Sequence, residues 1–146
     1  VIQLAKRMEK MGCFEISIGD TVGVATPKQV KSLFQKLKRA VPVKKLAGHF
    51  HDTRGMAVAN ILMAYQLGVR VFDTSLGGLG GCPYAPGASG NVATEDVVFM
   101  LQGMGIDTGI DLDALIQAGQ YISDHLGRPS SSRVAKAMMS KRKAAA

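Results

Sequence analysis

The sequence has few of the residue types that mark several common protein classes. It contains no Trp, aromatic residues make up 5% of it, and only two of its 146 residues are Cys. Two cysteines cannot build the disulfide framework of a small secreted domain, and no apolar run approaches the roughly 18 residues of a membrane span. The chain begins with Val and shows no signal or transit pattern, so we expect a piece of a longer protein.

Acidic residues are also scarce. There are 11 of them against 18 basic residues, which gives a net charge of +7. Most of the bases fall in two blocks without an acid, 28–45 and 128–143, and such runs are typical of a solvated helix face and a basic tail. Because aromatic platforms are lacking beside the charge, we do not expect nucleic acid as a partner. Without a long apolar run we expect no membrane partner either. A polyanionic small molecule such as a nucleotide-bearing cofactor remains open.

Apolar residues make up 47% of the sequence, enough for a core, and they recur in alternating strand and helix patterns. Parallel strands are predicted near 14–19, 45–50 and 69–75, with helices on their outer face. Their spacing fits the roughly 31 residues that a (β/α)8 barrel spends on each unit. Three strands cannot close a barrel, so the pattern predicts a doubly wound α/β sheet or the C-terminal part of a barrel.

The first candidate for chemistry is the run His49-Phe50-His51-Asp52, at the end of the second predicted strand. Residues i and i+2 of a strand point to the same face, so His49 and His51 could chelate one ion. Two imidazoles completed by oxygen ligands suit Mg, Mn, Fe or Zn. The alternative is two histidines that are separately hydrogen-bonded in the core.

Two further candidates follow the first and third strands. Asp20 ends the first strand, where a carboxylate can orient a histidine or accept a substrate proton; the alternative is an ordinary loop carboxylate. The glycine-rich segment 77–91 contains Cys82, which could act as an acid, base or nucleophile or be only a surface thiol. Cys13, at the start of a strand, is expected to be inert packing.

At these residues the sequence resembles the 3-hydroxy-3-methylglutaryl-CoA lyase family. The likeness runs from about Met11 to Arg133, and the run Gly-Leu-Gly-Gly-Cys-Pro-Tyr at 78–84 is its most specific part. The H-x-H pair and the later Asn are shared with synthases that condense acyl-CoA with 2-oxo acids. Those synthases differ in the loop that holds Cys82 here, so the resemblance favours the lyase.

The resemblance implies a divalent-metal barrel enzyme, with Mg²⁺ or Mn²⁺ as the expected ion. It would cleave 3-hydroxy-3-methylglutaryl-CoA, a CoA thioester, to acetyl-CoA and acetoacetate, as a homodimer of the full enzyme. The metal ligands implied are His49, His51 and Asn91, and His49 is also expected to be catalytic, with Cys82 and Asp20. Cys82 matches the loop thiol that protonates the acetyl-CoA carbanion, and Asp20 and Glu95 match carboxylates lining the site. The expected compartment is the cytoplasm of a bacterium, or the mitochondrial matrix if the source is eukaryotic.

The likeness also implies what this chain lacks. The family's fourth metal ligand, an Asp, and an adjacent Arg lie on the first barrel strand, and another acid lies on the second. We therefore expect residues 1–128 to form strands six to eight of a barrel with C-terminal helices, followed by a basic tail over 129–146. The isolated chain should then be inactive. The alternatives are a related condensing synthase and an inactive half-barrel that only binds a partner.

Overall fold

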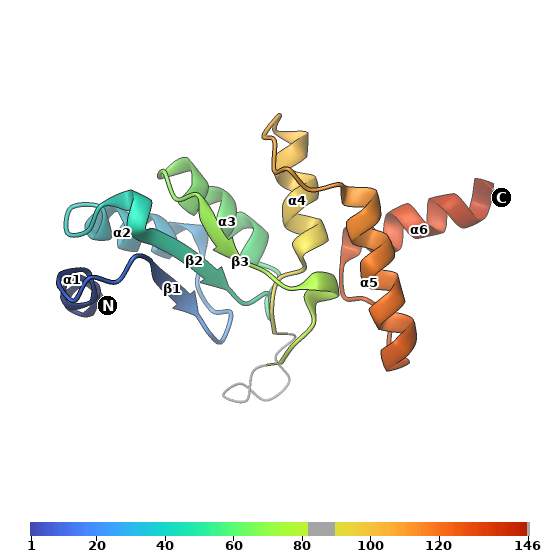
Figure 1. Ribbon diagram of the computed structural model, residues 1–146, viewed down its shortest axis with the longest axis horizontal. Helices are drawn as coiled ribbons and strands as arrows, with labels where there is room; N and C mark the ends of the chain where they lie inside the picture. The colour runs from blue at the N-terminus through green and yellow to red at the C-terminus, as the bar shows by residue number, and fades with distance from the viewer. Residues whose placement is uncertain (82–89, 146) are drawn as a thin grey trace.

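Three parallel strands form the centre of the molecule. The computed structural model describes residues 1–81 and 90–145 of the chain. In it β1 (Ile16–Asp20), β2 (Leu46–Phe50) and β3 (Val71–Asp73) form one sheet in the order β1-β2-β3, and both pairings are parallel. The prediction of three parallel strands is confirmed. Because all three run the same way, their carboxyl ends lie at one edge of the sheet (Figure 1).

Helices connect the three strands and continue the chain after β3. They are α1 (Ile2–Lys10), α2 (Pro27–Leu37), α3 (Ala57–Gln66), α4 (Thr94–Gly103), α5 (Leu112–Leu126) and α6 (Arg133–Ala145), with short 3-10 turns η1 (Val43–Lys45) and η2 (Leu76–Gly78). Pro27 occupies the first position of α2, where its missing N–H costs no hydrogen bond. Asp111 caps α5, because its carboxylate accepts the N–H groups of Asp113 and Ala114.

The sheet has two unlike faces. Helices α2 and α3 pack on one of them, where Ile16, Ile18 and Phe50 are buried together with Phe34 of α2 and Ile61 of α3. Burying side chains of this size contributes roughly 1.5–3 kcal/mol each. We call the opposite side the bare face; it carries Ser17, Gly19, Val71 and Asp73, which are exposed, and His49, which is half-buried.

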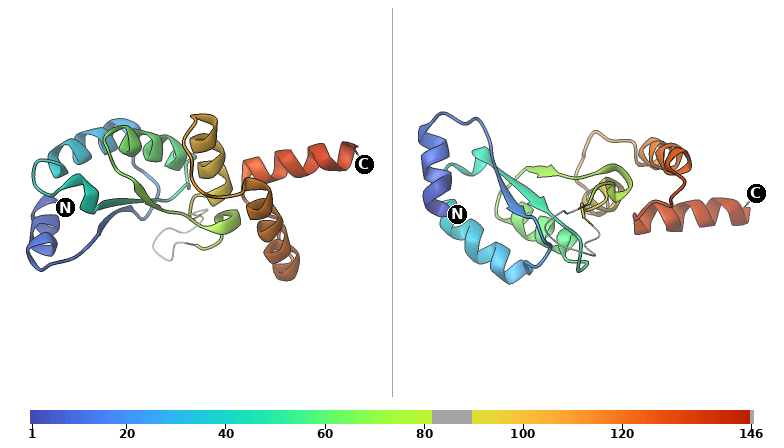
Figure 2. Two further views of the ribbon diagram at one scale, coloured as in Figure 1. Left: turned by 45° about the horizontal axis from the view of Figure 1, so that its top comes forward. Right: turned by 90° about the horizontal axis from the view of Figure 1, so that it is seen from below.

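The C-terminal helices lie beyond β3, at the end of the molecule away from α1 (Figure 2). The segment 129–146, expected as a basic tail, contains helix α6, which packs on α4. Its first turn is fixed by Asp96 of α4, whose carboxylate accepts Ser132 Oγ at 2.6 Å and the N–H of Val134 at 3.0 Å. The basic composition of this segment gave no sign of this anchor, because the partner lies 36 residues earlier.

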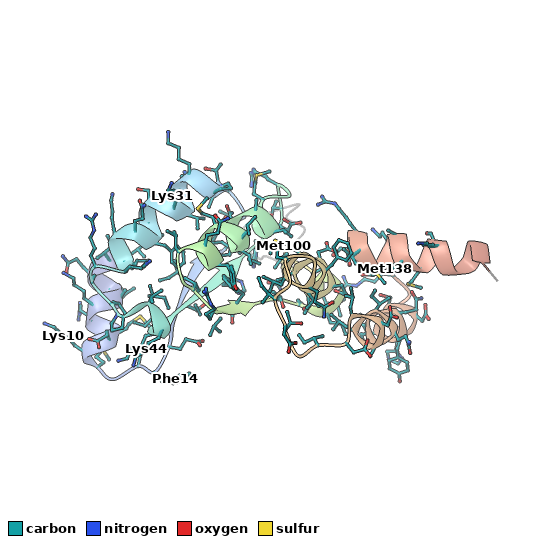
Figure 3. All side chains as sticks on the ribbon, turned by 90° about the horizontal axis from the view of Figure 1, so that it is seen from above. Lys10, Phe14, Lys31, Lys44, Met100 and Met138 are labelled. Carbon is teal, nitrogen blue, oxygen red and sulfur yellow. The ribbon has the colours of Figure 1, made fainter. Side chains whose placement is uncertain are left out.

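Basic side chains cover the other end of the molecule. Lys10 and Lys31 project from α1 and α2 (Figure 3), and both are exposed; Lys31 lies in the block 28–45 that was expected to form a solvated helix face. Lys45 is paired with Glu9 at 3.1 Å. Among residues 1–81 and 90–145, no helix is both long and apolar enough to cross a membrane.

Candidate active site

His49 and His51 lie together at the carboxyl end of β2. Their ring centroids are 5.1 Å apart and the ring planes are tilted by 51°. The strand geometry explains this, because His49 points to the bare face and His51 follows two residues later on the same side. Metal–nitrogen bonds are about 2.1 Å long, so rings this close are within reach of one ion.

The two histidines have different surroundings. His51 is 7% exposed, and its Nδ1 is buried without a hydrogen-bond partner. Burial lowers the pKa of His51, the neighbouring His49 lowers it further, and Asp20 acts in the opposite direction. The neutral imidazole is the form that binds a metal ion. A buried ring nitrogen with no protein partner, beside a second imidazole, therefore fits a divalent cation.

Asn91 stands next to this pair. It forms an isolated antiparallel bridge with His51, and its Nδ2 donates to the carbonyl of Leu79 at 2.9 Å. That hydrogen bond leaves the amide oxygen as the atom that could bind a cation. Gly90, at φ +82°, makes the approach possible, since a Cβ there would lie 2.8 Å from the carbonyl oxygen of Gly80.

Asp20 is tied to its own loop. Its carboxylate oxygens accept the N–H groups of Val24 and Ala25, at 3.1 and 2.8 Å. Its carbonyl accepts the N–H of His51 at 3.2 Å, so the backbone of Asp20 helps to place the second histidine. These contacts match the alternative given for Asp20 from the sequence, an ordinary loop carboxylate. They leave each carboxylate oxygen with capacity for another donor.

Glu95 lies within the helical layer, fully buried. Both of its carboxylate oxygens accept the N–H of Gly77, at 3.0 Å. Burial raises the pKa of Glu95, while the hydrogen bonds from the backbone act in the opposite direction. The contacts of Glu95 are thus with the start of the glycine-rich segment, and they hold the backbone at Gly77, two residues before Leu79.

Cys82, the proposed proton donor, lies outside the described residues. Among residues 1–81 and 90–145, no three or more His, Cys, Asp and Glu side chains come close enough to hold a metal ion. The two histidines would therefore need the oxygen of Asn91 and further ligands from elsewhere. A cavity of about 310 Å³ opens beside Asn91, bordered by Asp52, Arg54 and Arg133.

Sequence reasoning missed two polar residues of the bare face, Ser17 and Asp73. Asp73 Oδ2 lies 3.6 Å from His49 Nδ1, and Ser17 Oγ donates to the same oxygen at 2.7 Å. The signal in the sequence was the position of Asp73, at the last residue of the third strand and level with His49. In parallel sheets such rim positions share one site.

Comparison with known proteins places the fold. The sequence model of the HMGL-like family matches residues 1–122. The chain belongs to the HMGL-like family. The crystal structure of hydroxymethylglutaryl-CoA lyase from Pseudomonas aeruginosa superposes with a TM-score of 0.92 at 50% identity over 96% of this chain. The three βα units are thus part of a TIM barrel, which is the fold that the resemblance implied and one of the two that the strand pattern allowed.

Several proteins about half identical to this chain are named hydroxymethylglutaryl-CoA lyases. The mitochondrial hydroxymethylglutaryl-CoA lyase of Arabidopsis thaliana is 56% identical over 138 residues, 94% of this chain. A lyase from Acinetobacter baumannii, solved with coenzyme A and 3-methylmalate, is 47% identical with a TM-score of 0.87 over 92% of this chain. The chain spans 30% of the Arabidopsis protein and 47% of the Pseudomonas structure.

Proposed function

We propose that the protein carrying this chain cleaves 3-hydroxy-3-methylglutaryl-CoA to acetyl-CoA and acetoacetate, using a divalent metal ion. One observation carries the proposal: the paired imidazoles of His49 and His51, with Asn91 bridged to His51, stand at the strand ends of a chain about half identical to such lyases. Mg²⁺ or Mn²⁺ is the ion proposed, because completion by amide and carboxylate oxygens suits these metals.

His49, His51 and Asn91 would hold the ion. A divalent cation held there would polarise the C3 hydroxyl of the substrate and lower its pKa. Asp20, beside His51, is the proposed acceptor of the hydroxyl proton. When that proton leaves, the C2–C3 bond breaks, C3 becomes the ketone of acetoacetate, and the electron pair stays on C2 as the enolate of acetyl-CoA.

Cys82 is proposed to donate a proton to C2 and so complete acetyl-CoA. A thiol with an ordinary pKa near 8.5 is mostly protonated at neutral pH, as this step requires. The cavity beside Asn91 supports the substrate class, because Arg54 and Arg133 border it and could face the anionic groups of a CoA thioester. The homodimer and a compartment, cytoplasmic or mitochondrial, are likewise proposals; relatives carry both locations in their names.

The experiment measures acetoacetate release by the full-length protein that carries this chain, per folded and Mn²⁺-loaded molecule. We expect Cys82→Ser to lower turnover by about 10²–10⁴-fold, the range of general acid catalysis, with Mn²⁺ binding unchanged. Cys13→Ser is the matched control. Cys13 was expected at the start of a strand and lies three residues before β1, where it packs against the hydrophobic core, so its loss should leave turnover per folded molecule unchanged.

Three outcomes would contradict the proposal. Turnover of Cys82→Ser equal to that of the wild type would remove the acid role of the thiol. Equal Mn²⁺ affinity in the wild type and in His51→Ala would remove the metal site. Condensation of acetyl-CoA with a 2-oxo acid, without cleavage of the lyase substrate, would assign the protein to the synthases. The isolated 146-residue chain is expected to show no turnover, because the further ligands of the ion lie outside it.

A further inference from the structure

We propose that Asp73, held by Ser17, is the positioning residue that orients His49 and fixes its tautomer, with the proton on Nδ1 and Nε2 left as the nitrogen that binds metal. The inference deepens the proposed function and rests on its assignment of His49 as a ligand. Neither Ser17 nor Asp73 would touch the ion in this arrangement; both act through His49.

The contacts that support this proposal join side chains of all three strands on the bare face. Ser17 Oγ of β1 donates to Asp73 Oδ2 of β3 at 2.7 Å. The same oxygen lies 3.6 Å from Nδ1 of His49 on β2, the strand between them. His49 and Asp73 are partners in the β2–β3 register, so the backbone sets their side chains next to each other.

Small neighbours leave room for these contacts. Ser17 pairs in register with Ala47, and Ala47 pairs with Val71. Because Ala47 carries only a methyl group, the hydroxyl of Ser17 and the carboxylate of Asp73 can meet across the middle strand. Gly19 pairs with His49 on the other side and adds no side chain there, so the ring is not crowded from β1.

The chemistry follows from the imidazole. A neutral ring has one N–H donor and one acceptor, and the group that faces one nitrogen decides which nitrogen keeps the proton. A carboxylate at Nδ1 favours the proton there and frees Nε2 for a cation. Carboxylates behind ligating histidines are common in metalloproteins, and their loss typically lowers metal affinity about 10–100-fold.

The hydrogen bond from Ser17 helps to hold the carboxylate of Asp73 in its orientation. It occupies the oxygen of Asp73 that faces His49, so it restricts the rotation of the carboxylate. Both contacts of this oxygen are with side chains, whereas the carboxylate of Asp20 binds backbone N–H groups. Asp20 therefore shapes a loop, and Asp73 is available to orient a ring.

The test uses the full-length protein and Mn²⁺ alone, with affinity measured by electron paramagnetic resonance titration. Asp73→Asn should raise the Kd for Mn²⁺ by about 10–100-fold. Ser17→Ala should raise it by less, and Ser17→Thr, which keeps the hydroxyl, should restore the wild-type value. In the Asp73→Asn background Ser17→Ala should add nothing further, since Ser17 acts through Asp73. Asp107→Asn, an exposed change in the α4–α5 connection, is the control and should bind as the wild type does.

A second readout needs no metal. In ¹⁵N-histidine spectra of the metal-free protein, His49, assigned from a His49→Gln variant, should be the Nδ1–H tautomer and should become a mixture in Asp73→Asn. An Nε2–H tautomer in the wild type, or wild-type Mn²⁺ affinity in Asp73→Asn, would overturn the inference. If the wild type bound no Mn²⁺ at all, the proposed metal site would fail, and the tautomer of His49 would still decide the role of Asp73.

Discussion

Glu95 has an ionisable group at a position with no exposure to solvent, and its two oxygens share the N–H of one glycine, Gly77. A carboxylate in this setting loses its hydration and gains only part of it back from the backbone. Glu95 lies in the first turn of α4, where acidic residues are common. The sequence could not predict its burial, because that depends on α5 and η2, which pack on α4 from distant parts of the chain.

The raised pKa of Glu95 predicts how stability depends on pH. The folded protein holds this proton to a higher pH than the unfolded chain does, for which the ordinary value is 4.5. The contribution of Glu95 to the free energy of unfolding is therefore fully present below pH 4.5 and is lost as pH rises through the raised pKa. The glutamine side chain of Glu95→Gln stays neutral at every pH, so this loss of stability with rising pH should be absent in the variant. Urea unfolding of both proteins from about pH 4 to about pH 7 measures it, and equal slopes would contradict the assignment.

Gly119 lies against the same carboxylate. A Cβ at this position of α5 would stand 2.6 Å from Glu95 Oε1, and that oxygen cannot move freely because it is bound to Gly77. We expect Gly119→Ala to destabilise the fold by about 1–3 kcal/mol, as overpacking does. The free energy of unfolding from urea denaturation measures this loss.

Gly103, the last residue of α4, is the matched control. Nothing lies within 4 Å of a Cβ built there. Gly103→Ala should therefore be neutral or stabilising, by up to about 0.5–1 kcal/mol, since alanine favours the helix. A similar loss of stability in both variants would show that the contact with Glu95 is not the cause.

At the scale of whole elements, the three strands and five of the helices could be predicted because each follows a local pattern. Alternation marks β1, and helical periodicity with Pro27 at the start marks α2. Helix α4 begins at Thr94, with Ala93 before it. Helix α6 was not predicted at all, because its start depends on Asp96 rather than on its own sequence.

This dependence gives a prediction for α6. Asp96→Ala should cost about 0.5–2 kcal/mol, the usual effect of a lost helix cap, and should loosen α6 from its first turn. Amide hydrogen exchange along α6 should become faster, and exchange in β1 and β2 should not change. Asp111→Ala, which removes the cap of α5, is the control, and its effect should stay in α5. Unchanged protection of α6 in Asp96→Ala would show that its packing on α4 suffices.

At the scale of the whole molecule, chemistry and stability lie on different sides of the sheet. The apolar residues that pack under α2 and α3 hold the fold together, and the polar residues of the bare face and the strand ends form the candidate site. The sequence predicted the paired histidines and the neighbourhood of Asn91, because they follow motifs. It did not predict the contact of Ser17 with Asp73, which spans 56 positions and joins two non-adjacent strands.

The bare face also predicts how the isolated chain behaves in solution. Within the described residues, β1 and β3 each pair with β2 alone, and Val71 on β3 is 39% exposed. Open strand edges next to apolar surface favour pairing with another chain. We expect concentration-dependent self-association of the 146-residue chain in analytical ultracentrifugation, reduced by Val71→Lys. Val24→Lys, at a loop residue that is 52% exposed, should leave association unchanged. A chain that stays monomeric at high concentration would contradict this prediction.

The hydrogen bonds from Ser131 to the carbonyl of Gly77 set an order of events during synthesis. Both Ser131 N and Ser131 Oγ donate to that oxygen, across 54 positions of the chain. At roughly 5–20 residues per second, Ser131 is made about 3–11 seconds after Gly77. The backbone at Gly77, which leads to the neighbours of Asn91, therefore acquires its last partners only when the ribosome has nearly finished this segment. All three strands are synthesised before Ser131, so we expect the histidine pair to be positioned before this contact with Gly77 forms.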